Sequence, residues 1–159
     1  MFVSFVIAIL FGAAPADETT VSSVPLTISF GDFSFAGDTV KLTKSRNGAF
    51  ECEIEGNAQV AVVHSGVSVT AHSINIQRDA NSQITIRCAN DCRFTDSGAT
   101  CTADRIQIHL AKEATLHLSG SSRVECRTGA ERTVIESETI SIENGKFSVP
   151  GANSLQGAH

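Results

Sequence analysis

Hydrophobic and polar residues alternate along most of the chain after residue 25. Stretches such as LTISF, INIQ, IQIHL and ISIEN place an apolar side chain at every second position. A period of two is typical of β-strands that bury one face, because successive side chains of a strand point to opposite sides of the sheet. Clusters of Gly, Asn, Asp and Ser separate these stretches and predict turns. The pattern predicts an all-β fold.

The alternating stretches also repeat along the chain. The tripeptides that start at Val40, Ile74, Ile106 and Ile140 follow one another at steps of 34, 32 and 34 residues. The same steps align three further columns of mainly apolar residues: Leu26, Val60, Cys92 and Val124; Cys52, Ile84 and Leu116; and Phe35, Val69, Cys101 and Ile135. A fixed period of this length is typical of stacked structural repeats. We therefore expect an elongated twisted β-jelly roll, or a solenoid-like stack, of about four repeats of 32–34 residues.

The two ends of the chain differ from this repeat region. Residues 1–16 hold an apolar run followed by small residues, which predicts a secretory signal peptide, although no Lys or Arg precedes the run. We expect residues 17–25 to be a linker, 26–149 the repeat domain and 150–159 a flexible tail. On this interpretation the protein is periplasmic or secreted.

The charge of the chain argues against one class of partner. The sequence has 12 Lys and Arg against 17 Asp and Glu, a net charge of −5, and its basic residues are not clustered. Proteins that bind nucleic acid usually present a basic patch to the phosphates. We therefore expect no nucleic-acid partner.

The triplet Asp96-Ser97-Gly98 matches the loop that carries the catalytic Asp of aspartic proteases, which pair two such loops. The chain holds one copy, and the repeat aligns it with segments that begin at His64 and Thr128. Asp, Ser and Gly are also common turn residues for conformational reasons. We interpret the triplet as a turn, and we expect a protein that is not an enzyme and has no cofactor.

The five cysteines suggest one or two disulfides in an exported chain. Cys88 and Cys92 enclose Ala89-Asn90-Asp91, which predicts a hairpin loop whose base brings the two cysteines within disulfide reach. The pairing of Cys52, Cys101 and Cys126 stays open. No second cysteine pair completes a zinc site, and the alternation places His109 and His117 on the outward faces of their strands. We expect no metal.

Two stretches of the sequence carry a family resemblance: EIEGNAQVAVVHSGVSVTAHSINIQ and ATLHLSGSSRVECRTGAERTVIESETISIENGKFSV. Their order of apolar strand, small turn, apolar strand, short loop and alternating strand resembles the OstA-like (LptA) family of periplasmic lipopolysaccharide-transport domains. The resemblance implies a non-enzymatic, twisted β-jelly roll whose interior holds lipid acyl chains. It also implies docking edge to edge with envelope partners or with a second copy. The five cysteines and the acidic composition depart from that family's usual pattern.

The inward positions of the repeats are then candidates for contact with lipid. They are Val60, Val62, Ile74, Ile76, Ile84, Ile86, Phe94, Ile106, Ile108, Leu116, Leu118, Val124, Ile140 and Ile142. Apolar columns of this kind would line a channel for acyl chains, but a dry protein core requires them equally. The sequence leaves both an open groove and a filled core open. A filled core would favour the alternative function, a structural or adhesive β-solenoid of the envelope.

Overall fold

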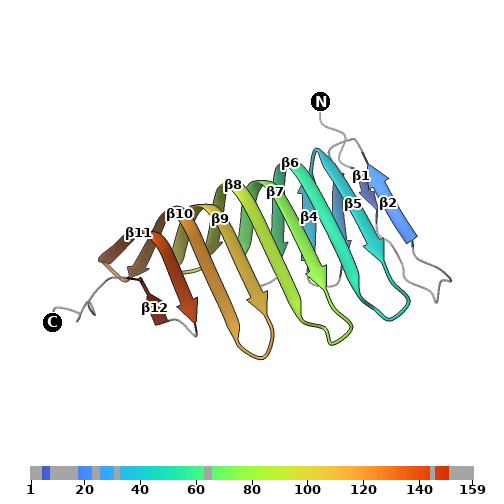
Figure 1. Ribbon diagram of the computed structural model, residues 1–159. Coiled ribbons are helices and arrows are strands. Elements are labelled where there is room, and N and C mark those ends of the chain that lie inside the picture. Colours follow the sequence, from blue (N-terminus) through green and yellow to red (C-terminus); the bar gives the residue numbers. More distant parts are fainter. Residues whose placement is uncertain are drawn as a thin grey trace.

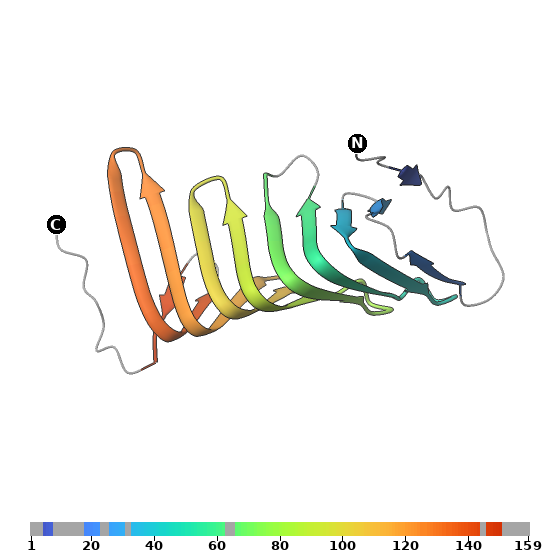
Figure 2. The same cartoon turned by 90° about the horizontal axis from the view of Figure 1, so that it is seen from above.

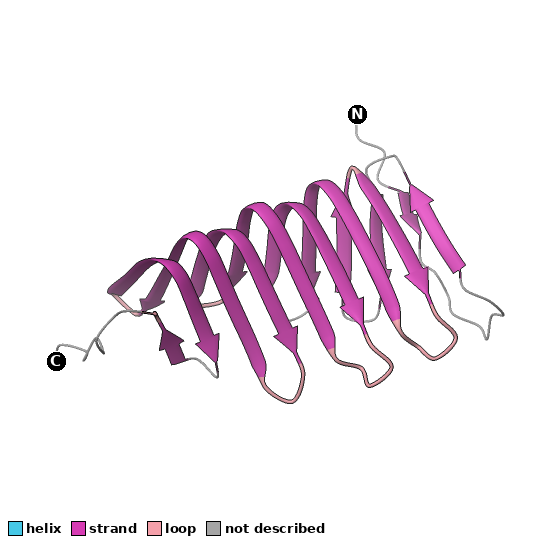
Figure 3. Ribbon diagram, viewed as in Figure 1, coloured by secondary structure: helices cyan, strands magenta, loops and turns pink. Residues whose placement is uncertain are grey.

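The structure, a computed structural model, describes residues 5–7, 18–22, 26–30, 33–62, 66–143 and 146–150. Its described residues form strands and turns and no helix (Figure 3). The strands are β1 (Phe5–Ile7), β2 (Glu18–Ser22), β3 (Leu26–Phe30), β4 (Phe33–Gly37), β5 (Thr39–Lys44), β6 (Phe50–Val62), β7 (Ser68–Arg78), β8 (Ile84–Asp96), β9 (Ala99–Leu110), β10 (Ala114–Thr128), β11 (Glu131–Glu143) and β12 (Lys146–Ser148) (Figure 1). The predicted all-β class is confirmed.

All these strands belong to one open sheet. From β6 to β12 each strand pairs antiparallel with the next, so the chain runs back and forth across the sheet. β6 pairs with β4 along one half and with β5 along the other, and these two strands together match one long strand. Each sequence repeat therefore corresponds to a pair of antiparallel strands. The chain does not wind in one direction, as the coils of a solenoid would.

Each long strand bends near its middle. In β6, β8 and β10 the bend consists of two consecutive residues with positive φ: Gly56 and Asn57, Asn90 and Asp91, and Gly120 and Ser121. The pairing register with the neighbouring strands shifts at these bends. Extra residues of this kind are β-bulges, which bend a strand. The bends line up across the sheet and fold it into two walls (Figure 2).

We call the two sides of this fold the first wall and the second wall. The first wall consists of β5, residues 50–55, 73–78, 84–89, 105–110, 114–119 and 139–143, and β12. The second wall consists of β4 and residues 58–62, 68–71, 92–96, 99–103, 122–128 and 131–137.

Aspartate side chains fix the bends from the neighbouring strand. The backbone N–H of Asp38 donates to the carbonyl of Gly56 (2.8 Å), and Asn57 Nδ2 donates to Asp38 Oδ2 (3.1 Å). A Cβ atom at Gly56 would overlap the Asp38 side chain, and one at Gly120 would overlap Asp104. Glycine at these two positions therefore permits both the positive φ and the close approach of the carboxylate.

The register confirms part of the predicted repeat. We say that residues lie at one level when the pairing register places them opposite one another on neighbouring strands. One level of the first wall contains Val40, Ile74, Ile106 and Ile140, and one level of the second contains Phe35, Val69, Cys101 and Ile135. Two predicted columns are wrong. Ile86 takes the level assigned to Ile84, and Phe94 takes the level assigned to Cys92.

Turn length explains the error. At the β9–β10 turn, three residues lie between the last paired residues, Leu110 and Ala114. Five residues lie between Lys44 and Phe50 at the β5–β6 turn, and five between Arg78 and Ile84 at the β7–β8 turn. A fixed step of 32 residues ignores this difference and shifts the β8 columns by two positions.

The chain ends are described in part. β1 lies in the segment predicted as a signal peptide, and β2, which pairs with β5, lies in the predicted linker 17–25. The remaining residues of 1–17 and the tail from residue 151 lie outside the described residues.

Candidate functional site

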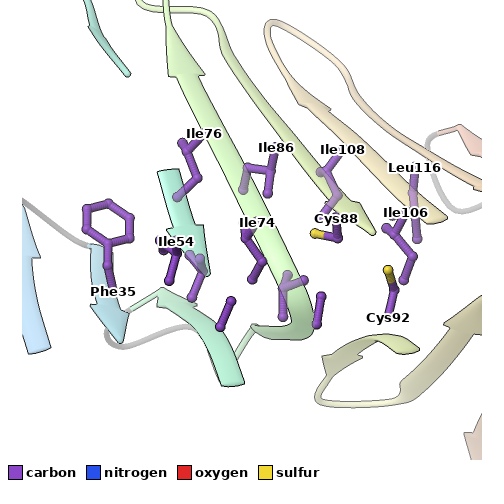
Figure 4. Packing of buried hydrophobic residues seen from close by; sticks show 14 of the residues in the cluster. Phe35, Ile54, Ile74, Ile76, Ile86, Cys88, Cys92, Ile106, Ile108 and Leu116 are labelled. Carbon is purple, nitrogen blue, oxygen red and sulfur yellow. The ribbon is translucent and has the colours of Figure 1, made fainter. Parts of the chain in front are cut away.

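The space next to the bends is filled by side chains from both walls. Ile54, Ile74, Ile106, Leu118 and Ile140 are at most 2% exposed and lie at one level across five strands. Figure 4 shows Ile54, Ile74 and Ile106 within this cluster, together with residues of the next level. This half of the interior is a packed core.

Farther from the bends the walls separate and leave an apolar groove. Its volume is about 570 Å³. The first wall contributes Ile86, Ile108, Leu110, Ala114, Thr115, Leu116, Ile142 and Phe147, and the second wall with its turns contributes Phe33, Val60, Val62, Val67, Val69, Phe94, Asp96, Ala99 and Cys101. We call this feature the interior groove. Its size and lining are typical of a site for a small apolar ligand.

The interior groove contains half of the predicted lipid-contact residues. Those that line it are Val60, Val62, Ile86, Phe94, Ile108, Leu116 and Ile142. The others, Ile74, Ile76, Ile84, Ile106, Leu118, Val124 and Ile140, pack in the core or against it and do not line the groove. The alternation identified inward-facing residues, but the distance of each from the bend decides whether it meets the groove.

Several groove residues were missed by the sequence prediction. Val69 and Cys101 belong to a predicted inward column, and Leu110 continues the alternation of Ile106 and Ile108, so the sequence held a signal for these three. Phe147 lies on β12, which folds back on β11 so that Phe147 opposes Ile142. Its side chain is 42% exposed at the end of the groove.

Asp96 is the one acidic residue among those that line the interior groove. It ends β8 and opposes Ala99 across the β8–β9 turn, and its Oδ1 accepts the backbone N–H of Ser97 (2.6 Å). The backbone N–H of Arg127 donates to the carbonyl of Gly98 (2.9 Å). Asp96-Ser97-Gly98 is therefore a hairpin turn, as the repeat predicted.

The predicted hairpin at Ala89-Asn90-Asp91 is wrong. β8 passes through this segment and pairs with β9 on both sides of it, with Cys88 opposite Ile106 and Cys92 opposite Ala103. The segment is the bend of β8, so the hairpin base that suggested a Cys88–Cys92 disulfide does not exist. Both residues are buried free thiols in this structure, and both lie in the interior (Figure 4).

The buried thiols are poor nucleophiles. Burial raises the pKa of Cys52 and Cys101 to about 12 and that of Cys92 to about 11, and it raises the pKa of Cys88 even more strongly. The thiol of Cys92 donates to the carbonyl of Asp104 (3.3 Å). Since the thiolate is the reactive species, these groups act as small apolar side chains at neutral pH.

The outer face of the first wall is polar and carries both predicted outward histidines. Gln107 Nε2 lies 2.7 Å from His109 Nε2, and Thr85 Oγ1 lies 3.1 Å from His109 Nδ1. His117 Nδ1 lies 2.9 Å from the hydroxyl of Ser141. Among the described residues, no three His, Cys, Asp or Glu side chains are grouped so that they could hold a metal ion.

Comparison of the chain with protein-family models, curated proteins and solved structures found no match. Within the described ranges no helix is long and apolar enough to cross a membrane.

Proposed function

We propose that this protein is an exported, non-enzymatic lipid-binding protein of the OstA-like type. The interior groove holds acyl chains of lipopolysaccharide or a related lipid, and the bent sheet is the twisted β-jelly roll of that family. The observation that carries the proposal is the groove itself, because apolar side chains from both walls line a volume of about 570 Å³. Packed cores leave few voids larger than a water molecule. A space of this size and polarity therefore suits an apolar ligand.

The edges of the sheet supply the second part of the proposal, docking to envelope partners or to a second copy. β12 pairs with residues 141–143 of β11, whereas the outer edge of residues 131–137 faces no other described strand. An unpaired strand edge presents backbone groups to which another strand can add. This edge extends the second wall, so a docked strand would lengthen the groove.

Native mass spectrometry of the full chain, purified after export, tests this proposal. We expect a complex with lipid that dissociates on collisional activation and leaves the protein at the mass of the processed chain without its signal peptide. Protein that carries no lipid and also fails to bind added lipid would contradict the proposal.

A structural or adhesive role of the envelope is the second candidate. The packed half of the interior and the exposed Val134 (39%) beside the unpaired edge favour it. In the same measurement this role predicts a ladder of lipid-free oligomers.

A further inference from the structure

Basic residues recur at one place along the free end of the first wall. Lys44, Arg78 and Lys112 follow one another at steps of 34 residues. Lys44 and Arg78 both oppose Phe50, and Arg78 also opposes Ile84. Lys112 lies in the turn between Leu110 and Ala114, two residues that line the interior groove. The three turns that carry this end of the wall appear as pink loops along the lower edge of Figure 3. We call the three basic residues the basic row.

One end of the basic row borders the interior groove. Phe50, Arg78, Ile84 and Leu110 lie at one level on successive strands, and Leu110 lines the groove. Lys44 and Arg78 are two strands apart, as are Arg78 and Leu110, so neighbours in the row are separated by about 10 Å at the usual strand spacing. Lys112 therefore lies beside the mouth of the groove, and Arg78 and Lys44 continue the row along the same end of the first wall toward β5.

The acidic residues near the row do not reverse its sign. Asp79 follows Arg78, but its Oδ1 accepts the backbone N–H groups of Asn81 (2.8 Å) and Gln83 (2.9 Å) inside its own turn. Arg78 donates to the hydroxyl of Ser82 (2.9 Å), a neutral group. Glu113 follows Lys112 and Glu18 opposes Lys44, whereas the β5–β6 turn adds a further cation, Arg46.

The second wall contributes a negative charge to the mouth of the groove, because Asp96 lines the groove from that side. Arg127 and Arg132 at that end of the wall bind Glu125 instead, at 3.3 Å and 2.7 Å. An anionic group at the mouth of the groove is therefore attracted to the first wall and repelled from Asp96 on the second.

The volume limits the apolar part of the ligand. A cavity of about 150 Å³ holds the six carbons of benzene, or about 25 Å³ per carbon. At that density the groove's 570 Å³ takes roughly 20 carbons. This corresponds to one long acyl chain or two short ones. A lipid with more acyl chains would leave some of its chains exposed to water when it is bound to one copy of the protein.

We propose that the interior groove binds an anionic lipid with one or two acyl chains and holds its head group at the end of the basic row formed by Arg78 and Lys112. This inference rests on the proposed function and specifies its ligand. Charge complementarity selects the head group, and groove volume selects the number of chains.

The test compares oleate with monoolein, which has the same acyl chain and a neutral head, by titration of the full chain below the micelle concentrations. We expect oleate to bind at least tenfold more tightly in low salt, with the ratio falling as salt screens the charges. The Arg78→Gln and Lys112→Gln variants should lose oleate affinity severalfold and keep monoolein affinity, and Asp96→Asn should gain oleate affinity. Arg87→Gln is the matched control, because Arg87 lies on the outer face and donates to Gln77 (2.7 Å).

The outcomes separate this inference from the proposed function. Equal affinity for the two lipids, or an equal loss in the Arg87→Gln control, overturns the inference while the groove still binds chains. Failure of both lipids to bind overturns the proposed function and the inference together. Native mass spectrometry adds the chain count: more than one bound oleate per protein at saturation contradicts the size limit.

Discussion

Ile86 and Phe94 lie on the same strand, β8, yet they line opposite walls of the interior groove, because Asn90 and Asp91 bend the strand between them. Each long strand thus supplies side chains to both walls. One antiparallel sheet forms a two-sided groove in this way without a second sheet. The groove therefore depends on the bends.

Replacing Gly120 by Ala should destabilise the protein. Gly120 has φ of 72°, and a Cβ atom would overlap the Asp104 side chain. We expect a loss of roughly 1–3 kcal/mol in the free energy of unfolding, measured by urea denaturation. Gly129→Ala is the matched control: its φ is 63°, but no atom lies within 4 Å of the new Cβ, so it carries only the backbone cost of about 1 kcal/mol. Equal losses in the two variants would show that Asp104 does not constrain the bend.

Phe147→Ser should weaken the binding of acyl chains severalfold. Phe147 is 42% exposed and lines the end of the groove, so its loss removes apolar contact with the ligand while the core stays intact. Val134→Ser is the matched control, since Val134 is 39% exposed and does not line the groove. Titration with oleate measures both variants. The account fails here if Val134→Ser lowers the affinity as much as Phe147→Ser does.

Cys126 should react first with iodoacetamide. It is only partly buried, whereas the other four cysteines are buried, and burial raises the pKa of Cys52, Cys88, Cys92 and Cys101. Since alkylation requires an exposed thiolate, those four should be labelled only after unfolding. Peptide mass mapping of a labelling time course gives the order. Labelling of Cys52 or Cys101 at the rate of Cys126 in the folded protein would contradict the packed interior.

The free energy of unfolding should fall as the pH rises above about 9. The folded-state pKa values of Cys52 and Cys101 are raised from 9.0 to about 12, so the unfolded chain loses these protons first. A raised folded-state pKa gives stability that is complete below the unfolded value and is lost as the pH rises through the folded one. The chain contains no Tyr, so Cys and Lys are the side chains that titrate in this window.

Urea denaturation at a series of pH values between 8 and 12 checks this prediction. The control is Cys52→Ala, which should be less stable at every pH but should lose less stability between pH 9 and 12. A stability that stays constant or rises over this window would show that the thiols are not buried.

The sequence predicted the fold class and the inward set because a period of two determines which face of a strand each residue occupies. It did not predict the level of each residue in β8, since Ile84 and Ile86 have the same parity and only the turn lengths distinguish them. The bend at Asn90 and Asp91 resembled a hairpin turn because both structures favour residues that tolerate positive φ. Phe147 was missed because its position depends on β12 folding back against β11.

Site-specific photo-crosslinking shows whether acyl chains occupy the interior groove. A diazirine analogue of an aliphatic residue is placed at Ile108, which lines the groove, or at His109, the next residue on β9, which bonds with Thr85 and Gln107 on the outer face. Circular dichroism first verifies that both labelled proteins fold. After irradiation with a radiolabelled fatty acid, the account predicts an adduct at position 108 and none at position 109. No adduct at 108, or equal adducts at both positions, would contradict it.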